Sequence, residues 1–155
     1  MARRSGLAAI FVLAAFTAFS TGSSWGAMGI LLPLVLPLCW AIMSSQGLTS
    51  GGDYSILYAS VSGVLAGAVW GDHCSPISDT TVMSSLSAGC DHIEHVRTQL
   101  PYAVLAGAAA LLFGTIPASL GLSWWVGMLL AASVTALGLR LLGQPVEDYR
   151  PAGDA

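Results

Sequence analysis

The sequence predicts an all-α integral membrane protein, and its composition, its hydropathy and its distribution of charge each indicate that class. Hydrophobic residues make up 55% of the chain and charged residues only 8%, and the mean hydropathy is +0.75. Soluble domains carry about 25% charged residues, so this chain has too few to cover a soluble fold. Residues 5–52 and 98–139 contain no charged side chain at all. At about 20 apolar residues per crossing, the length allows about four to six membrane segments.

The first uncharged block contains two apolar arms, Leu7–Phe19 and Met28–Met43, joined by the polar linker STGSSWG at 20–26. Each arm is short for a full crossing, and the linker is rich in small hydroxyl residues. The block is therefore either a re-entrant hairpin that lines a protein cavity or a pair of tightly connected transmembrane helices. We expect Pro33 and Pro37 to bend the second arm.

A loop is predicted at residues 44–53 because they are rich in Ser and Gly. The following stretch, Ile56–Trp70, is apolar and predicts a membrane helix. Gly63 and Gly67 form a G-x-x-x-G pattern in it, which is typical of helices that pack closely in lipid. We expect this helix to end at Gly71.

A broken helix is predicted around Pro76. Proline lacks an N–H group and disfavours a helical conformation at Ser75 before it. A second half-helix should then run toward Cys90, and four residues are candidates to cap its start: Ser78, Asp79, Thr80 and Thr81. The ends of two half-helices supply partial charges and free carbonyl groups, from which membrane transporters build cation sites.

The remainder predicts two more membrane helices and a tail. Asp91–Gln99 is polar and should form a short helix or turn at the membrane surface. Tyr102–Leu122 and Ser123–Leu142 are each long and apolar enough to cross the bilayer. We therefore divide the chain into a transmembrane domain, residues 1–142, and a polar tail, residues 143–155.

Ionisable residues gather in the segment 71–102. The chain has five Lys or Arg and eight Asp or Glu residues, and five of these charged residues lie there, with all three histidines and two of the three cysteines. They are Asp72, Asp79, Asp91, Glu94, Arg97, His73, His92, His95, Cys74 and Cys90. Ionisable groups at membrane depth are costly and usually functional, so this segment is the candidate site.

Asp72 and Asp79 are the main candidates because apolar helix is predicted on both sides of them. No Lys or Arg lies between Asp53 and Asp91. A buried carboxylate must pair with a cation, bind one or take up a proton. A carboxylate that alternates between a bound cation and a proton is the minimal device for exchanging Na⁺ against H⁺. The neighbouring hydroxyl groups offer the oxygen ligands that a hard cation prefers, and they belong to Ser75, Ser78, Thr80 and Thr81. The alternative for Asp79 is that it only caps the second half-helix.

His73 lies beside Asp72 and either relays protons or is a structural histidine, and both interpretations stay open. The spacing of Cys74, Cys90, His92 and His95 matches no common zinc site, so we expect no metal other than Na⁺ and no cofactor. The sequence contains no hydrolase or phosphate-binding motif, which argues against an enzyme. It has no basic tract that would indicate nucleic-acid binding.

Two stretches, GDHCSPISDTTVMSSLSAGCDHIEHVRTQLPYA and STGSSWGAMGILLPL, together resemble the C-terminal part of the NhaC-type Na⁺/H⁺ antiporter family. The resemblance implies a protein of two inverted repeats, each with a re-entrant hairpin and a broken helix, of which this chain is the second. It implies a hairpin tip of Thr21, Gly22, Ser23, Ser24 and Trp25. It also implies a broken helix that carries Asp72, Ser75, Ser78, Asp79, Thr80 and Thr81. Ser23 stands where the family often has Thr, which keeps the hydroxyl group.

The expected function is Na⁺/H⁺ antiport across the cytoplasmic (inner) membrane of a prokaryote, by a fragment of a full transporter in which Na⁺ and H⁺ are the transported ions. One alternative is an exchanger of organic anions or amino acids coupled to Na⁺ or H⁺. Another is a truncated membrane subunit that does not transport. The expected partners are the lipid bilayer and either the missing first repeat or a second copy of the chain. With a hairpin that returns to its starting side, Arg3 and Arg4 lie opposite Arg97, Arg140 and Arg150, and this difference of one arginine slightly favours a cytoplasmic position for Arg97 and the tail.

Overall fold

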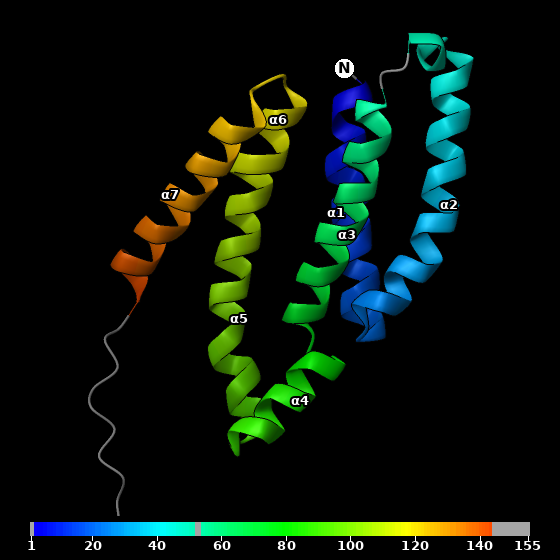
Figure 1. Ribbon diagram of the computed structural model, residues 1–155. Coiled ribbons are helices and arrows are strands. Elements are labelled where there is room, and N and C mark those ends of the chain that lie inside the picture. The colour runs from blue at the N-terminus through cyan, green and yellow to red at the C-terminus, as the bar shows by residue number, and fades with distance from the viewer. Residues whose placement is uncertain (1, 52–53, 144–155) are drawn as a thin grey trace, which may run out of the picture.

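The computed structural model describes residues 2–51 and 54–143, and every regular element in those ranges is helical, as predicted. The tail predicted after residue 143 lies outside the described residues. Figure 1 shows the elements, which are α1 (Ala2–Thr21), α2 (Ser24–Ser45), the 3₁₀ helix η1 (Leu48–Gly51), α3 (Ser55–Cys74), α4 (Asp79–Ala88), α5 (His92–Ala109), the π-helical η2 (Ala110–Thr115), α6 (Ile116–Ser119) and α7 (Trp124–Leu142).

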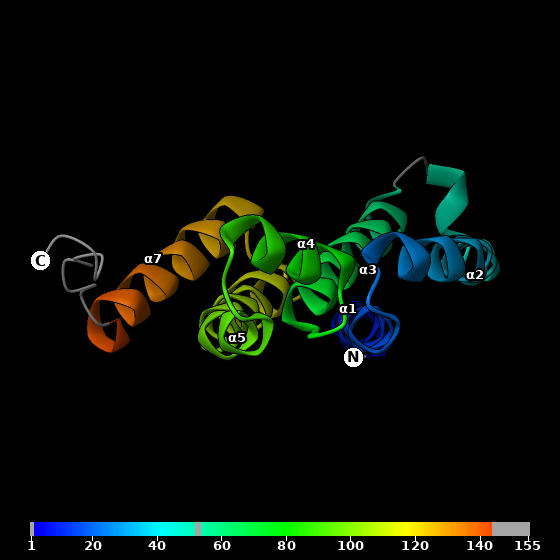
Figure 2. The same cartoon turned by 90° about the horizontal axis from the view of Figure 1, so that it is seen from below.

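The helices form an elongated row (Figures 1 and 2). In this row α1 and α3 lie side by side, α2 lies at one end and α7 at the other, with α5 between α3 and α7. The buried apolar side chains are mostly alanines, and large apolar side chains remain exposed on every long helix. A soluble protein rarely exposes so much apolar surface, so lipid or another membrane helix must cover it.

The first two helices make a tight hairpin whose only connecting residues are Gly22 and Ser23. Gly22 has φ +69°, which favours glycine, and the Ser23 side chain caps α2 by accepting a hydrogen bond from the Gly26 amide (3.3 Å). At 1.5 Å per residue the arms are about 30 Å long, close to the thickness of the hydrocarbon core. Both prolines predicted to bend the second arm lie inside α2, which bends in Figure 1. α2 also runs two residues into the predicted loop.

α3 packs on α1 through small residues. A methyl group on Gly67 would overlap the backbone carbonyl of Phe11, and one on Gly71 would overlap that of Ala15. The predicted role of the G-x-x-x-G pattern is therefore confirmed. The prediction that the helix ends at Gly71 is wrong, because this glycine is a helix-packing residue and α3 continues to Cys74.

Three helices in the described residues are long and apolar enough to cross a membrane, where the chain length allowed four to six. They are Ser24–Ser45, the continuous helix His92–Ala118 and Trp124–Leu141. The polar segment Asp91–Gln99, predicted as a short helix or turn, is helical but is not separate: it forms the first turns of the second of these helices, with Asp91 as its cap. α4 is short because Gly89, at φ +63°, ends it.

Candidate functional site

The site is built on the break between α3 and α4. Ser75 has extended backbone (φ −80°, ψ +130°), as expected for a residue before proline, and its amide bonds the Asp72 carbonyl (3.0 Å). Ser78 caps α4, and its hydroxyl accepts a hydrogen bond from the Thr80 amide (3.2 Å). The broken helix is thus present, about one turn later than Gly71. Asp72 consequently lies in the last turn of α3 and not in the unwound segment.

Asp72 joins the two half-helices through a triangle of side-chain contacts. The Asp72 residue is only 5% exposed. Oδ1 lies 2.8 Å from the Ser78 hydroxyl, Oδ2 lies 3.0 Å from the Thr80 hydroxyl, and the two hydroxyl oxygens are 2.7 Å apart. Three contacts need three hydrogens, but the two hydroxyls have only one each. The triangle is complete when the carboxyl group itself carries a proton, or when a cation replaces one of the hydrogen bonds.

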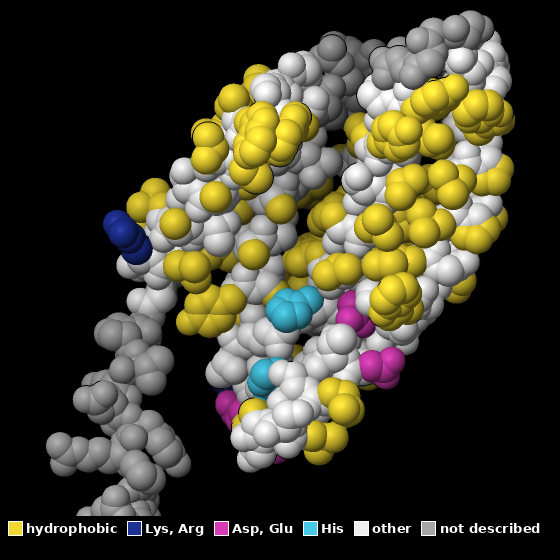
Figure 3. Space-filling model, in the orientation of Figure 1, with side chains coloured by type: hydrophobic (Ala, Val, Ile, Leu, Met, Phe, Trp, Pro, Cys, Tyr) yellow, Lys and Arg dark blue, Asp and Glu magenta, His cyan; other side chains and the backbone are white. Residues whose placement is uncertain are grey.

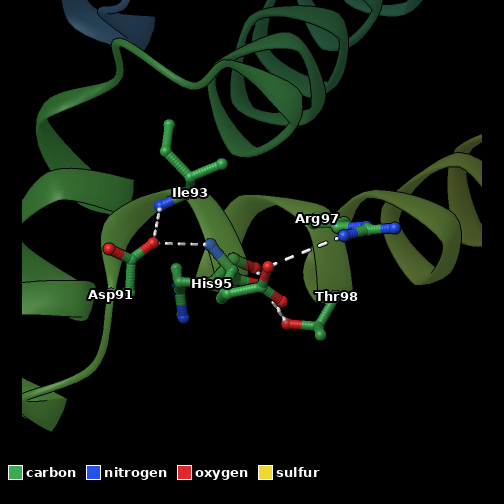
Figure 4. Close-up of polar contacts among 6 residues, drawn as sticks. Asp91, Ile93, His95, Arg97 and Thr98 are labelled. Carbon is green, nitrogen blue, oxygen red and sulfur yellow. Dashed lines mark hydrogen bonds and ion pairs between the residues drawn. The ribbon is translucent and has the colours of Figure 1, made fainter.

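No cationic side chain in the described residues pairs with Asp72. The one ion pair there joins Arg97 to Glu94 (3.6 Å) at the exposed start of α5, shown in Figure 4. The hydroxyl of Thr81, one residue after Thr80, is buried and has no hydrogen-bond partner among the described residues. A buried hydroxyl group without a partner is costly and calls for an explanation. The site therefore offers a carboxylate and several hydroxyl oxygens without a compensating positive charge.

The hairpin tip lies against the break, although more than fifty residues separate them in the sequence. The Asp79 amide donates to the Gly22 carbonyl (3.2 Å), and the Ser75 hydroxyl donates to the Phe19 carbonyl (2.8 Å). A Cβ on Gly22 would lie 2.6 Å from the Ile77 carbonyl oxygen, so the backbones are in direct contact. In Figure 1 the tip and the break are at the same level, whereas α5 begins lower.

The structure brings together only some of the predicted site residues. Asp72, Ser78 and Thr80 bond one another, and Thr81 lies one residue further along α4. Ser75 is buried but bonds the hairpin and not Asp72. The side chains of Asp79 and His73 are exposed, and Ser78, not Asp79, caps α4.

At the hairpin tip, the residue that touches the break is Gly22. The Thr21 hydroxyl bonds the Thr17 carbonyl of its own helix (2.9 Å), Ser23 caps α2, and Ser24 begins it. Trp25 is 83% exposed. Among the tip side chains, none bonds Asp72 in the described part of the chain. The contribution of the tip to the site is therefore made by its backbone.

A separate, open groove of about 950 Å³ lies between α3, α5 and α7. Its lining is mostly apolar, and His73 and Gln99 are among its few polar residues. Figure 3 shows the hollow and shows histidine and acidic side chains gathered toward the lower end of this face. Asp72 does not line the groove, so the groove is not the candidate ion site.

Sequence reasoning missed two residues of α5 that touch the break. His92 Nε2 lies 2.7 Å from the Pro76 carbonyl oxygen, and Gln99 Nε2 donates to the His73 carbonyl (2.9 Å). The only signal in the sequence is their spacing of seven residues, which places two polar side chains on one face of a helix that is otherwise apolar further along. For His92 and His95 the sequence analysis considered zinc ligation, disfavoured it because of their spacing, and assigned no other role. In the structure His92 lies within hydrogen-bond distance of Ser85, and His95 within that of Ser84.

Comparison with known proteins identifies the family. The model of the Na⁺/H⁺ antiporter family matches residues 2–116, which include the hairpin, the break and all of α5. The chain belongs to the Na⁺/H⁺ antiporter family. The hairpin tip and the Asp72 triangle both lie inside the matched region, so the family assignment rests on the same part of the chain as the site.

Three relatives extend this assignment. A protein of Haemophilus influenzae is 48% identical over 100 residues, which are 64% of this chain and 17% of the relative. A Na⁺/H⁺ antiporter of the same organism is 34% identical over 66% of this chain and 20% of its own length. The malate-2H⁺/Na⁺-lactate antiporter of Bacillus subtilis is 26% identical over 71% of this chain and 21% of its own length. The chain spans about a fifth of the length of these curated relatives. No solved structure matches it.

Proposed function

We propose that this antiporter-family chain carries the ion-binding and proton-coupling site of a secondary active transporter that exchanges Na⁺ for H⁺. The observation that carries the proposal is the triangle of Asp72, Ser78 and Thr80, which lacks one hydrogen. Either a proton on Asp72 or a cation among the three oxygens completes it. Because proton and cation compete for the same carboxylate, binding of one releases the other, which is the coupling that antiport requires.

The surroundings of the triangle favour a small, hard cation. All of its ligands are oxygens, and Thr81 adds a buried hydroxyl nearby. Asp72 lies in the last turn of α3, where the helix dipole is negative and attracts a cation. In this proposal Asp72 is the group that changes state, Ser78 and Thr80 are ligands, and Thr81 is the candidate fourth ligand. Ser75 positions the break against the hairpin.

Asp79 and His73, the other predicted residues, are not ligands of the cation in this proposal. Asp79 is at the surface of the described chain, where water or another segment of a transporter would meet it. His73 lies beside Asp72 in the sequence but its side chain is exposed, so we assign it a place on the proton path and not in the cation shell. No resident metal or cofactor is part of the mechanism, since Na⁺ is the transported ion.

We also propose that the chain works as part of a larger assembly in the prokaryotic cytoplasmic membrane. The region that matches this chain is only about a fifth of each relative's length, and the exposed Trp25 and Asp79 are surfaces for another membrane segment to cover. That segment belongs to a first repeat or to a second copy of the chain. The chain alone, in proteoliposomes, is expected to give no exchange. Robust Na⁺-driven proton flux from a monomer would refute this part of the proposal.

The test of the site is Na⁺-driven proton flux in everted vesicles. The chain replaces the corresponding segment of the Haemophilus influenzae Na⁺/H⁺ antiporter, and the native chimera is compared with Asp72→Asn and Asp79→Asn. Asp72→Asn keeps the shape of the carboxyl group but cannot lose a proton, so it should abolish flux. The Asp79→Asn variant is the matched control and should keep most of it. Normal flux in Asp72→Asn would refute the assignment of Asp72 as the ion-binding carboxylate.

A second candidate function is Na⁺- or H⁺-coupled exchange of organic anions. It is favoured by the similarity to the malate-2H⁺/Na⁺-lactate antiporter. The same triangle would then bind the coupling ion, and the organic substrate would bind elsewhere. Adding malate, lactate or amino acids to the flux assay separates the two functions. A flux that depends on such a substrate would favour the second candidate, and a flux indifferent to all of them would favour Na⁺/H⁺ exchange.

A further inference from the structure

Two side chains of α5 hold the backbone on either side of the break. Gln99 donates to the His73 carbonyl in the last turn of α3, where carbonyl groups have lost their helical partners (2.9 Å). His92 Nε2 lies 2.7 Å from the carbonyl oxygen of Pro76, inside the break. The hairpin holds the opposite side of the same segment through Phe19 and Gly22. The broken segment is thus fixed from two directions by groups that do not touch the Asp72 carboxyl group.

We infer that His92 is a positioning residue for the ion site, and that binding a proton on its ring tightens its hold on the break. The carbonyl of Pro76 can only accept, so Nε2 must carry a hydrogen in every state in which this contact exists. The opposite ring nitrogen, Nδ1, lies 3.0 Å from the Ser85 hydroxyl of α4. His92 therefore connects the break, the second half-helix and α5.

The hydrogens available to Ser85 distinguish two states of this connection. The Ser85 hydroxyl also lies 2.9 Å from the Val82 carbonyl, to which it can only donate. With a neutral ring, the single hydroxyl hydrogen goes either to Nδ1 or to Val82. With a protonated ring, Nδ1–H donates to Ser85, Ser85 donates to Val82, and Nε2–H donates to Pro76. Only the protonated ring satisfies all three contacts, and hydrogen bonds from a charged donor are the stronger ones.

The charged and titratable groups around His92 are all accounted for by other contacts or by exposure. Asp91 precedes it and caps α5 by accepting from the Ile93 and Glu94 amides (2.9 and 3.1 Å), as Figure 4 shows. Its carboxylate opposes the positive end of the α5 dipole, which would otherwise disfavour a charged ring. The remaining groups on the adjoining elements are Asp72 in its triangle, the exposed His73, Asp79 and Cys90, the half-buried Cys74, the Glu94–Arg97 pair, and His95 bonded to Ser84.

Hydrogen exchange of the Ser78 and Asp79 amides in bilayers measures the hold on the break directly. His92→Leu removes the donor, and loss of one hydrogen bond should speed exchange about fivefold. His92→Gln keeps a donor for Pro76 but binds no proton, so it should match the native chain wherever the native ring is neutral. His95→Leu is the matched control, since His95 bonds α4 but not the break, and it should leave these amides unchanged. Equal exchange in His92→Leu and His95→Leu would overturn the positioning role.

The proton dependence is measured as the exchange rate in His92→Gln divided by the exchange rate in the native chain. The intrinsic pH dependence of amide exchange is the same in both proteins, so it cancels in this ratio. The ratio should be near one while the native ring is neutral and rise several-fold as the pH is lowered and the ring binds a proton. A constant ratio would overturn the proton dependence.

Nitrogen NMR of the histidine-labelled native chain gives a second readout, with the hydrogen expected on Nε2 at high pH. A hydrogen on Nδ1 alone would contradict the geometry. The inference rests on the proposed function only in naming Asp72 as the ion site, and neither readout measures transport.

Discussion

Replacing Gly22 with alanine should separate the hairpin tip from the break. Gly22 has φ +69°, and a methyl group there would lie 2.6 Å from the Ile77 carbonyl oxygen and 3.0 Å from the Ile77 carbonyl carbon. The left-handed conformation costs a non-glycine residue roughly 1–2 kcal/mol. The neighbouring atoms are backbone and cannot rotate away, so the two segments must move apart. That movement also breaks the hydrogen bond from the Asp79 amide to the Gly22 carbonyl, worth about 1 kcal/mol.

Gly47→Ala provides the matched control for this prediction. Gly47 has nearly the same backbone conformation, φ +68°, but nothing lies within 4 Å of the place that a methyl group would take there, so alanine costs only the conformational strain. Thermal unfolding in lipid nanodiscs, followed by tryptophan fluorescence, should show Gly22→Ala less stable than Gly47→Ala by about 1 kcal/mol or more, roughly 3 °C in Tm. Equal losses in the two variants would refute direct contact between the tip and the break.

Two further substitutions test the packing and the break. Gly71→Ala should destabilise the α1–α3 pair strongly, because its methyl group would overlap the Ala15 carbonyl. Gly63→Ala meets only ordinary contacts beyond 3.4 Å and should be nearly neutral. Similar unfolding temperatures for the two variants would contradict this packing. Pro76→Ala restores an N–H group and should let the half-helices join, so that flux in the chimera falls while Tm stays within about 2 °C of native. Native flux in that variant would show that the ties to the hairpin and α5 hold the break without the proline.

The sequence predicted the elements that depend on local chemistry. Pro76 and the hydroxyl residues after it indicated the break and the cap of α4, and the small residues of α3 indicated its close packing. The end of α3 was misplaced because Gly71 has two common uses, ending a helix and packing against one. Only the packed structure shows that Ala15 lies opposite it.

The candidate site was predictable in its residue types but not in its contacts. The intramembrane position of Asp72 and the neighbouring hydroxyls follow from the sequence. Which of those hydroxyls reach the carboxyl group depends on how the half-helices meet, and the structure selects Ser78 and Thr80. The contact of His92 with Pro76 spans sixteen residues and a change of helix. The sequence could not predict this contact, because local spacing carries no information on which carbonyl group a ring nitrogen will meet.

The central claim, that proton and cation compete for Asp72, is tested most directly by infrared difference spectroscopy of the chain in bilayers. Na⁺ is added at constant pH and ionic strength, with K⁺ as the exchange salt, and the carboxylic-acid band is followed. Na⁺ should remove a protonated-carboxyl band from the spectrum of the native chain and create a carboxylate band. The Asp79→Asn variant should show the same change, and the Asp72→Asn variant should not. A spectrum unaffected by Na⁺, or the same change in Asp72→Asn, would contradict the account.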